Sequence, residues 1–291
     1  MTLEILATAQ AAHPEPMTRR TGRLRVENAE IHYEVSGQGP ALVLAHGLGG
    51  NHMSWWQQVG HFQQGFTCVT FAHRGFGPST VEGGQPDPRC YARDLAALLD
   101  HLQLDAVHLV GQSMGGWTVI EFCLHHLQRV RSLTLSATVG SLDLTQLRHL
   151  DPKDLDEWLQ RTGQAVAECH ALQIHPAAGL RMAREQAALH RLYQFIDECP
   201  QGLDKALLRE RLRAMRVRSP AELAATGIAV LILSPDEDLV IPPVALRALA
   251  AELPDARCIT LPHTGHSPYF ERAPVFNQCL GEFLQGIESR A

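Results

Sequence analysis

One serine of this chain stands in a spacing that suits nucleophilic catalysis. Ser113 lies in Gly111-Gln112-Ser113-Met114-Gly115, between an apolar run expected to form a strand (106–110) and a helical pattern (114–127). A serine on a sharp strand-to-helix turn adopts strained backbone angles, and glycines at 111 and 115 remove collisions with side chains two residues away. The turn also sets Ser113 at a helix N-terminus, which favours developing negative charge. The pattern predicts a nucleophile; an ordinary tight turn is the alternative.

A second glycine-rich segment could supply the groups that stabilise an oxyanion. His46-Gly47-Leu48-Gly49-Gly50 follows directly after the apolar run 41–45. Acyl transfer needs two N–H donors aimed at the carbonyl oxygen that becomes negative. We expect one from the backbone of Met114, the residue after the nucleophile, and one from the backbone of Leu48. His46 and Gly47 are expected to support this loop, with the His46 imidazole bonded to loop backbone. A glycine-rich loop that only turns the chain is the alternative.

An acid and a base could come from two later segments. Ser234-Pro235-Asp236-Glu237-Asp238 and Pro262-His263-Thr264-Gly265-His266 each follow an apolar run expected to be a strand. Parallel α/β sheets build their sites at the carboxyl ends of their strands. There a histidine would take the Ser113 proton and a carboxylate would orient its ring. The residues alone leave three carboxylates and two histidines as candidates.

The elements that must position these groups alternate between strand and helix. A hairpin pattern covers 23–36, and six apolar runs follow at 41–45, 66–72, 106–110, 130–136, 228–233 and 257–261. Helical patterns separate most of them, at 89–103, 114–127 and 242–253, and a last one closes the chain at 273–287. This spacing is typical of a mostly parallel sheet with helices on its faces, here with eight strands.

The alternation stops between residues 140 and 219. This stretch has no β-rich run and shows helical patterns at 154–162, 177–199 and 203–217. We therefore expect an α/β core formed by 22–139 and 220–291, with an all-helical insertion at 140–219. Residues 1–21 are expected to be a flexible N-terminal tail.

Composition narrows the functional classes. The chain has 291 residues, 45% of them hydrophobic, a formal net charge of −6 and a sequence pI near 6.2. Without a basic stripe it does not resemble a nucleic-acid-binding or membrane-surface protein, and no apolar run approaches the roughly 20 residues that cross a bilayer. Seven dispersed cysteines without a CxxC pair indicate free thiols, which favours the cytoplasm.

Taken together, these segments resemble the α/β-hydrolase family, in particular its esterases, lactonases and C–C bond hydrolases with a helical cap. The resemblance runs from about residue 22 to 287. It rests on the following segments: His46-Gly47-Leu48-Gly49, Arg74-Gly75-Phe76-Gly77-Pro78-Ser79, Gly111-Gln112-Ser113-Met114-Gly115-Gly116, Asp238-Leu239-Val240-Ile241-Pro242, and Gly265-His266 followed by Glu271, Pro274 and Phe276.

The resemblance implies an assignment of the acid and the base. In the family the acid lies four residues before a proline, which selects Asp238 over Asp236 and Glu237. The base follows a glycine, which selects His266 over His263. One departure is Ala72, where relatives often carry Asp; it is expected to alter loop support only.

The family also indicates what the insertion is for. It resembles the cap that shapes the substrate pocket in relatives. Large side chains in it, and Trp117 after the nucleophile, are expected to be packing residues more often than ligand contacts. Those in the insertion are Trp158, Met182, Leu192, Tyr193 and Phe195.

The leading functional hypothesis is a serine hydrolase that cleaves a small carboxylic ester or lactone through an acyl-Ser113 intermediate. This route requires no metal or cofactor. An alternative is hydrolysis of a carbon–carbon bond in a vinylogous diketone acid, although such relatives usually have Asn where this chain has Gln112. A ligand-binding or signalling protein and a cofactor-free oxygenase on the same fold are further alternatives. A Ser at 113 disfavours the dehalogenase and epoxide-hydrolase branches, which use Asp.

Overall fold

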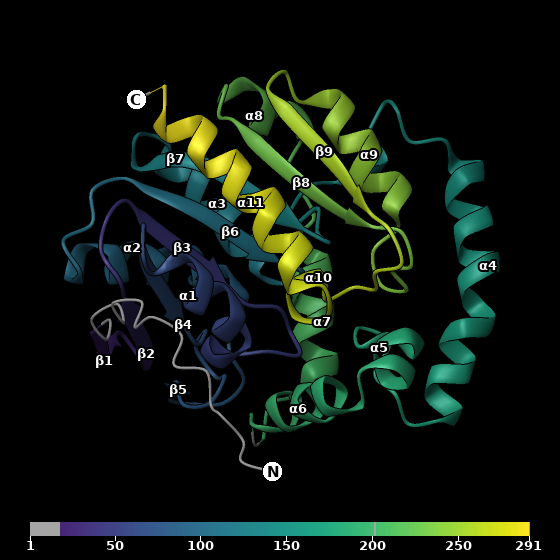
Figure 1. The fold of residues 1–291 in the computed structure, drawn as a ribbon, viewed down its shortest axis with the longest axis horizontal. Helices are drawn as coiled ribbons and strands as arrows, with labels where there is room; N and C mark the ends of the chain where they lie inside the picture. The colour runs from purple at the N-terminus through teal and green to yellow at the C-terminus, as the bar shows by residue number, and fades with distance from the viewer. Residues whose placement is uncertain (1–17, 201, 291) are drawn as a thin grey trace, which may run out of the picture.

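The computed structural model describes residues 18–200 and 202–290, which form one mixed sheet covered by helices (Figure 1). The strand order is β1-β2-β4-β3-β6-β7-β8-β9, and a two-residue strand, β5, pairs with β2. All neighbours from β4 to β9 are parallel, whereas β1, β2 and β5 are attached antiparallel. The α/β-hydrolase architecture expected from the sequence is confirmed, with β5 added to the eight predicted strands. The strands are β1 Arg19–Val26, β2 Ala29–Ser36, β3 Ala41–Ala45, β4 Thr67–Phe71, β5 Thr80–Val81, β6 Val107–Gln112, β7 Val130–Ser136, β8 Val230–Pro235 and β9 Ala256–Leu261.

The central strands are continuous apolar runs because they are buried on both faces. Every residue of β3, β6 and β8 is buried. Their side chains pack into two large clusters, one on each side of the sheet, which is the arrangement expected of a parallel sheet covered by helices. The edge strand β1 has no buried residue.

The first strand corrects part of the expectation for the N-terminus. Most of the predicted tail, residues 1–17, lies outside the described residues. Arg19–Thr21, however, belong to β1 and pair with the end of β2, so a flexible tail reaching to residue 21 is wrong. Its first four residues, Arg19–Gly22, carry no apolar side chain and give no alternation signal, unlike Leu24 and Val26 farther along the strand. The ladder to β2 and ion pairs such as that of Arg19 with Glu34 hold them.

Helices cover both faces of the sheet. α1 and α11 pack on one face, and α2, α3, α8 and α9 pack on the other (Figure 1). No helix within 18–200 and 202–290 combines the length and the apolar character that a membrane span requires. The helices are α1 Trp56–Phe62, α2 Tyr91–His101, α3 Gly115–His125, α4 Pro152–Ala171, α5 Gly179–Glu185, α6 Ala187–Glu198, α7 Lys205–Ala214, α8 Pro220–Ala225, α9 Pro243–Glu252, α10 Pro268–Glu271 and α11 Ala273–Glu288.

Helices α4–α7 belong to the segment between β7 and β8 and lie beyond the carboxyl ends of the strands (Figure 1). Two helix boundaries here differ from the sequence expectation. α4 continues through Gly163 to Ala171, because one glycine costs a helix only about 1 kcal/mol. The pattern at 177–199 is two helices, interrupted at Gln186, whose side chain donates a hydrogen bond to the backbone of Glu271 (3.0 Å).

Candidate active site

Ser113 occupies a strained turn between β6 and α3. Its φ is +48°, in the left-handed region that non-glycine residues rarely adopt. The turn is fixed on both sides of the serine: its N–H donates to the carbonyl of Ser136 (3.1 Å), and its carbonyl accepts from the Thr138 hydroxyl (2.7 Å) and the Gly116 N–H (2.9 Å). Strain of this kind persists only where the surroundings hold it, and it is concentrated at functional sites.

Glycines at this turn are required by close backbone packing. A Cβ on Gly111 would lie 2.8 Å from the carbonyl oxygen of Gly115, and a Cβ on Gly115 would lie 2.2 Å from the carbonyl oxygen of Ala45. Gly47 is restricted by side chains instead, since its Cβ would lie 2.1 Å from Oε1 of Gln112 and 3.1 Å from Cβ of Ser113. These three glycines therefore let the nucleophile turn approach the end of β3 and the loop that follows it.

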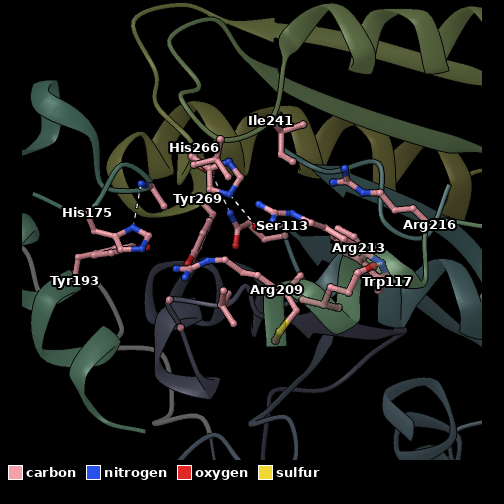
Figure 2. A pocket seen from close by; sticks show the side chains of 18 residues that line it. Ser113, Trp117, His175, Tyr193, Arg209, Arg213, Arg216, Ile241, His266 and Tyr269 are labelled. Atoms are coloured by element: carbon pink, nitrogen blue, oxygen red, sulfur yellow. Dashed lines mark hydrogen bonds between the residues drawn. The ribbon is translucent and has the colours of Figure 1, made fainter. Parts of the chain in front are cut away.

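The structure brings Ser113, His266 and Asp238 into one hydrogen-bonded chain. Ser113 Oγ is 2.8 Å from Nε2 of His266, and Nδ1 of His266 is 2.8 Å from Oδ2 of Asp238. The other oxygen of Asp238 accepts the backbone N–H groups of Val240 (2.7 Å) and Ile241 (2.9 Å). Asp238 and His266 are almost completely buried, so solvent does not compete for these bonds. Figure 2 shows the His266–Ser113 contact at the centre of the pocket.

The competing acidic and basic residues have other partners. Asp236 accepts the backbone N–H of Thr264 (3.2 Å). Glu237 pairs with Arg181, and the hydrogen bonds from that guanidinium lower the pKa of the carboxyl group. The His263 side chain is 72% exposed, beside Glu237. Within the described residues none of the three bonds to Ser113 or His266.

Leu48 and Met114 line the same pocket as Ser113. In the described part of the chain, the backbone N–H of neither residue donates to a protein acceptor. Met114 is the N-cap of α3, so its N–H belongs to the unpaired first turn of a helix. Both groups are therefore available to a carbonyl oxygen that enters beside Ser113.

His46 supports the loop of residues 46–50 through a buried hydrogen-bond network. Its Nδ1 lies 2.7 Å from the carbonyl of Gly47, and its Nε2 lies 2.9 Å from Nδ1 of His73 and 3.0 Å from the His73 N–H. The second nitrogen of His73 reaches the hydroxyl of Thr118 on α3 (2.8 Å). Burial lowers the pKa of His46 to about 3 and that of His73 well below its ordinary value, so both rings are neutral. His73, which follows Ala72, is a supporting residue that the sequence analysis missed.

The pocket in front of Ser113 has a volume of about 210 Å³. Of the large side chains considered for the insertion, Tyr193 lines it and the other four do not; Trp117 lines it while remaining buried. The polar side of the wall was not predicted from the sequence. That side is formed by His175, Arg209, Arg213 and Arg216 (Figure 2).

One cluster outside the pocket has metal-ligand character. Ligand atoms of His32, Glu34 and His52 lie within 4.8 Å of one another. The Glu34 carboxylate is already engaged by Arg19, whose Nε donates to Oε2 (2.9 Å) and whose terminal nitrogen bonds Oε1. A cation would have to displace this guanidinium, so the residues present do not form a prepared metal site.

Comparison with known proteins identifies the family. A family model described as "alpha/beta hydrolase fold" matches residues 40–273. The "Putative carbamate hydrolase RutD" of Variovorax paradoxus is 29% identical over 269 residues, which cover 89% of this chain and 97% of that protein. Two solved structures share the fold. A thermophilic esterase from Thermogutta terrifontis has a TM-score of 0.74 at 24% identity and covers 92% of this chain and 99% of its own. An enol-lactonase from Burkholderia xenovorans has a TM-score of 0.71 at 23% identity, and the match covers 91% of this chain and 100% of the lactonase chain. Because the family model matches well over half of the sequence, the chain belongs to the α/β-hydrolase family.

Proposed function

We propose that this hydrolase cleaves a carboxylic ester or lactone of a small molecule through an acyl-Ser113 intermediate. The observation that carries the proposal is the hydrogen-bonded chain from Ser113 Oγ through His266 to the buried carboxylate of Asp238. A nucleophile bonded to a base, and a base oriented by a third group, is the arrangement that covalent catalysis by serine requires.

In the first step Ser113 Oγ attacks the substrate carbonyl carbon. Its proton passes to Nε2 of His266 as the C–O bond forms, and the resulting imidazolium is stabilised by Asp238, which remains ionised. The oxyanion accepts the backbone N–H groups of Leu48 and Met114. The tetrahedral intermediate then expels the alkoxide, which takes the proton from His266, and acyl-Ser113 remains.

In the second step water replaces the alcohol. His266 removes a proton from the water as its oxygen attacks the acyl carbon, and it returns that proton to Ser113 Oγ as the acid leaves. Both steps use the same base and the same two N–H donors. Neither step needs a metal or cofactor.

Hydrolysis of a carbon–carbon bond in a vinylogous diketone acid is the second candidate. The segments Arg74-Gly75-Phe76-Gly77-Pro78-Ser79 and Ser113-Met114-Gly115-Gly116 support it. Gln112 counts against it, because relatives of that kind usually have Asn there. The two candidate activities break different bonds, so an assay with one substrate of each kind distinguishes them.

The test is steady-state turnover of 4-nitrophenyl esters of short acids beside a coloured ring-fission product. We expect the wild-type protein to hydrolyse the esters with many turnovers, and Ser113→Ala to lose at least about a thousandfold in kcat. Turnover of the ring-fission product alone would establish the second candidate. Unchanged ester turnover by Ser113→Ala would remove the proposed mechanism.

A matched pair of variants tests the acid within the same assay. Asp238→Asn removes the charge that orients His266 and is expected to lower kcat by about 10⁴-fold, as a wrong histidine tautomer does. Asp236→Asn changes a neighbouring carboxylate that bonds only Thr264 in the described structure, and we expect an effect of a few-fold at most. A larger loss for Asp236→Asn would show that the acid is misassigned.

A further inference from the structure

Three arginines follow one face of α7 and its C-terminal turn. Arg209, Arg213 and Arg216 are spaced by four and three residues, and helical neighbours at these spacings share a face. Asp204 caps the start of the helix by accepting the N–H groups of Ala206 (3.0 Å) and Leu207 (2.9 Å). Beyond the helix the turn continues, since the N–H of Arg216 donates to the carbonyl of Arg213 (3.0 Å).

This face is turned into the pocket that holds Ser113. Arg209, Arg213 and Arg216 all line it, together with Leu212. In Figure 2 their side chains extend from the α7 side of the pocket toward the side where Ser113 and His266 lie. Packing fixes the helix in this position: Leu212 and Leu208 join a buried cluster with Met114 and Trp117.

The three guanidinium groups have no carboxylate or hydrogen-bond partners within 18–200 and 202–290. None lies within 4.0 Å of a carboxylate there, and none donates a side-chain hydrogen bond. Two other arginines of the same segment differ in this respect. Arg211 donates to the carbonyls of Gln85 (3.2 Å) and Pro86 (2.7 Å), and Arg218 pairs with Glu121.

The positive charge is not compensated by the rest of the wall. The lining of the pocket contains no Asp or Glu. Arg216 is half-buried, its Nε is buried without a hydrogen-bond partner in the described structure, and its guanidinium lies 5.1 Å from the centre of the Trp117 ring. Burial and the charge of Arg213 lower the pKa of Arg216. Arg209 and Arg213 are like charges four residues apart on a helix, which is unfavourable, and Arg216 is half-buried with only the Trp117 ring against its guanidinium; a bound anion would offset both costs.

We infer that the substrate of this site carries a carboxylate, or a similar oxyanion, separate from the bond that is cleaved, and that Arg209, Arg213 and Arg216 bind it. Planar guanidinium groups match the geometry of such oxygens and bind them as charge-assisted hydrogen bonds. The inference rests on the proposed function, because it assigns a substrate class to the same nucleophile. It makes this protein a hydrolase of acidic esters or lactones.

Two pairs of esters test the inference, one for each side of the scissile bond. On the acyl side, 4-nitrophenyl hydrogen adipate is compared with neutral 4-nitrophenyl hexanoate. On the alcohol side, 4-acetoxybenzoate is compared with neutral 4-acetoxybenzamide. We expect kcat/KM to favour the acidic member of at least one pair by about tenfold or more at low salt, and the preference to fall as salt screens the charges. No preference for either acidic member would overturn the inference and leave the proposed function standing.

Arginine variants test whether the preference for acidic esters arises at the three pocket arginines. Arg213→Gln and the double variant Arg209→Gln/Arg213→Gln are expected to reduce the acidic-to-neutral ratio of kcat/KM by about three- to tenfold per arginine, a modest effect because both side chains are exposed to solvent. Arg211→Gln is the control: it removes a charge from the same helix outside the pocket, and the ratio should stay unchanged. An equal loss in Arg211→Gln would attribute the preference to net charge and contradict the site.

A binding measurement separates this inference from the proposed reaction. Titration of Ser113→Ala with adipate and with inorganic phosphate, followed by calorimetry, needs no turnover. We expect at least one of the two anions to bind, and the substitutions Arg209→Gln/Arg213→Gln to weaken this binding. Binding of adipate would indicate a carboxylate site, and binding of phosphate a phosphate site. If Ser113→Ala binds an anion but the wild-type protein hydrolyses none of the esters, the proposed function alone is overturned. If neither anion binds, the inference is overturned.

Discussion

At the scale of single residues, the environment of Asp238 supports its proposed role as the acid. Its side chain is fully buried, yet each oxygen has a partner: two backbone N–H groups on one and His266 on the other. A buried carboxylate without such partners would take up a proton. The residue types alone left three carboxylates as alternatives, because the sequence does not show which of them the turn after β8 directs inward.

Glu271 is a second buried carboxyl near this turn, and it predicts a pH dependence of stability. Burial raises its pKa to about 8, and the charges of Glu237 and Asp238 add to the effect. Between the ordinary value of 4.5 and about 8, the folded protein keeps a proton that the unfolded chain releases. This contribution to the free energy of unfolding therefore falls as pH rises through that window, by up to about 1.4 kcal/mol per pH unit, and is constant above it.

The corresponding experiment compares wild type with Glu271→Gln, which cannot ionise. We expect the free energy of unfolding of the variant, relative to wild type, to increase steadily from pH 5 to pH 8. Denaturant titrations at pH 5, 6.5 and 8 measure it. A difference that does not change with pH would show that Glu271 keeps an ordinary ionisation in the folded state.

At the scale of elements, the contact between α3 and β3 depends on one glycine. A Cβ on Gly115 would approach the Ala45 carbonyl oxygen to 2.2 Å, and a backbone atom cannot move aside as a flexible side chain does. We expect Gly115→Ala to destabilise the protein by about 1–3 kcal/mol through overpacking, and to lower ester turnover because the displaced helix carries the Met114 N–H.

Gly163 provides the matched control for this prediction. It lies within α4, and nothing stands within 4 Å of the Cβ that Ala would add. Gly163→Ala should stabilise the protein by about 0.5–1 kcal/mol, because Ala loses less conformational freedom in a helix. Thermal or denaturant unfolding of the two variants measures both effects. Equal stabilities would contradict the packing argument.

The sequence predicted some elements better than others, for physical reasons. Strands β3, β6 and β8 were predicted because burial on both faces requires a continuous apolar run. The short helix α1 was missed, since seven residues give too little periodicity. The interruption at Gln186 was missed as well, because neither a proline nor a glycine marks it and the partner of its side chain lies 85 residues away.

At the scale of the whole molecule, the site is assembled by the order of the strands. The loops after β3, β6, β8 and β9 supply Leu48, Ser113, Asp238 and His266, and these strands lie in one parallel run of the sheet. Their carboxyl ends therefore open toward one edge. This is why local motifs and a strand pattern were enough to predict that these segments meet at one edge, whereas the choice of Asp238 and His266 within them came from the family resemblance.

The pocket wall was not predictable in the same way. Which face of α7 meets the pocket is decided by the packing of Leu208 and Leu212 against Trp117, a contact between segments about 90 residues apart. The spacing of the three arginines is visible in the sequence, but arginines at such spacing on a helix ordinarily form a solvated face. Only the docked helix shows that they line the cavity.

The measurement that tests the central claim most directly is covalent labelling with a fluorophosphonate, followed by digestion and mass spectrometry. The reagent reacts with a serine whose hydroxyl is activated by a neighbouring base. We expect one label per chain, located on Ser113, absent from Ser113→Ala and formed much more slowly in Asp238→Asn. A stoichiometric label on another residue, or no label on a protein that hydrolyses esters, would contradict the assignment of Ser113 as the nucleophile.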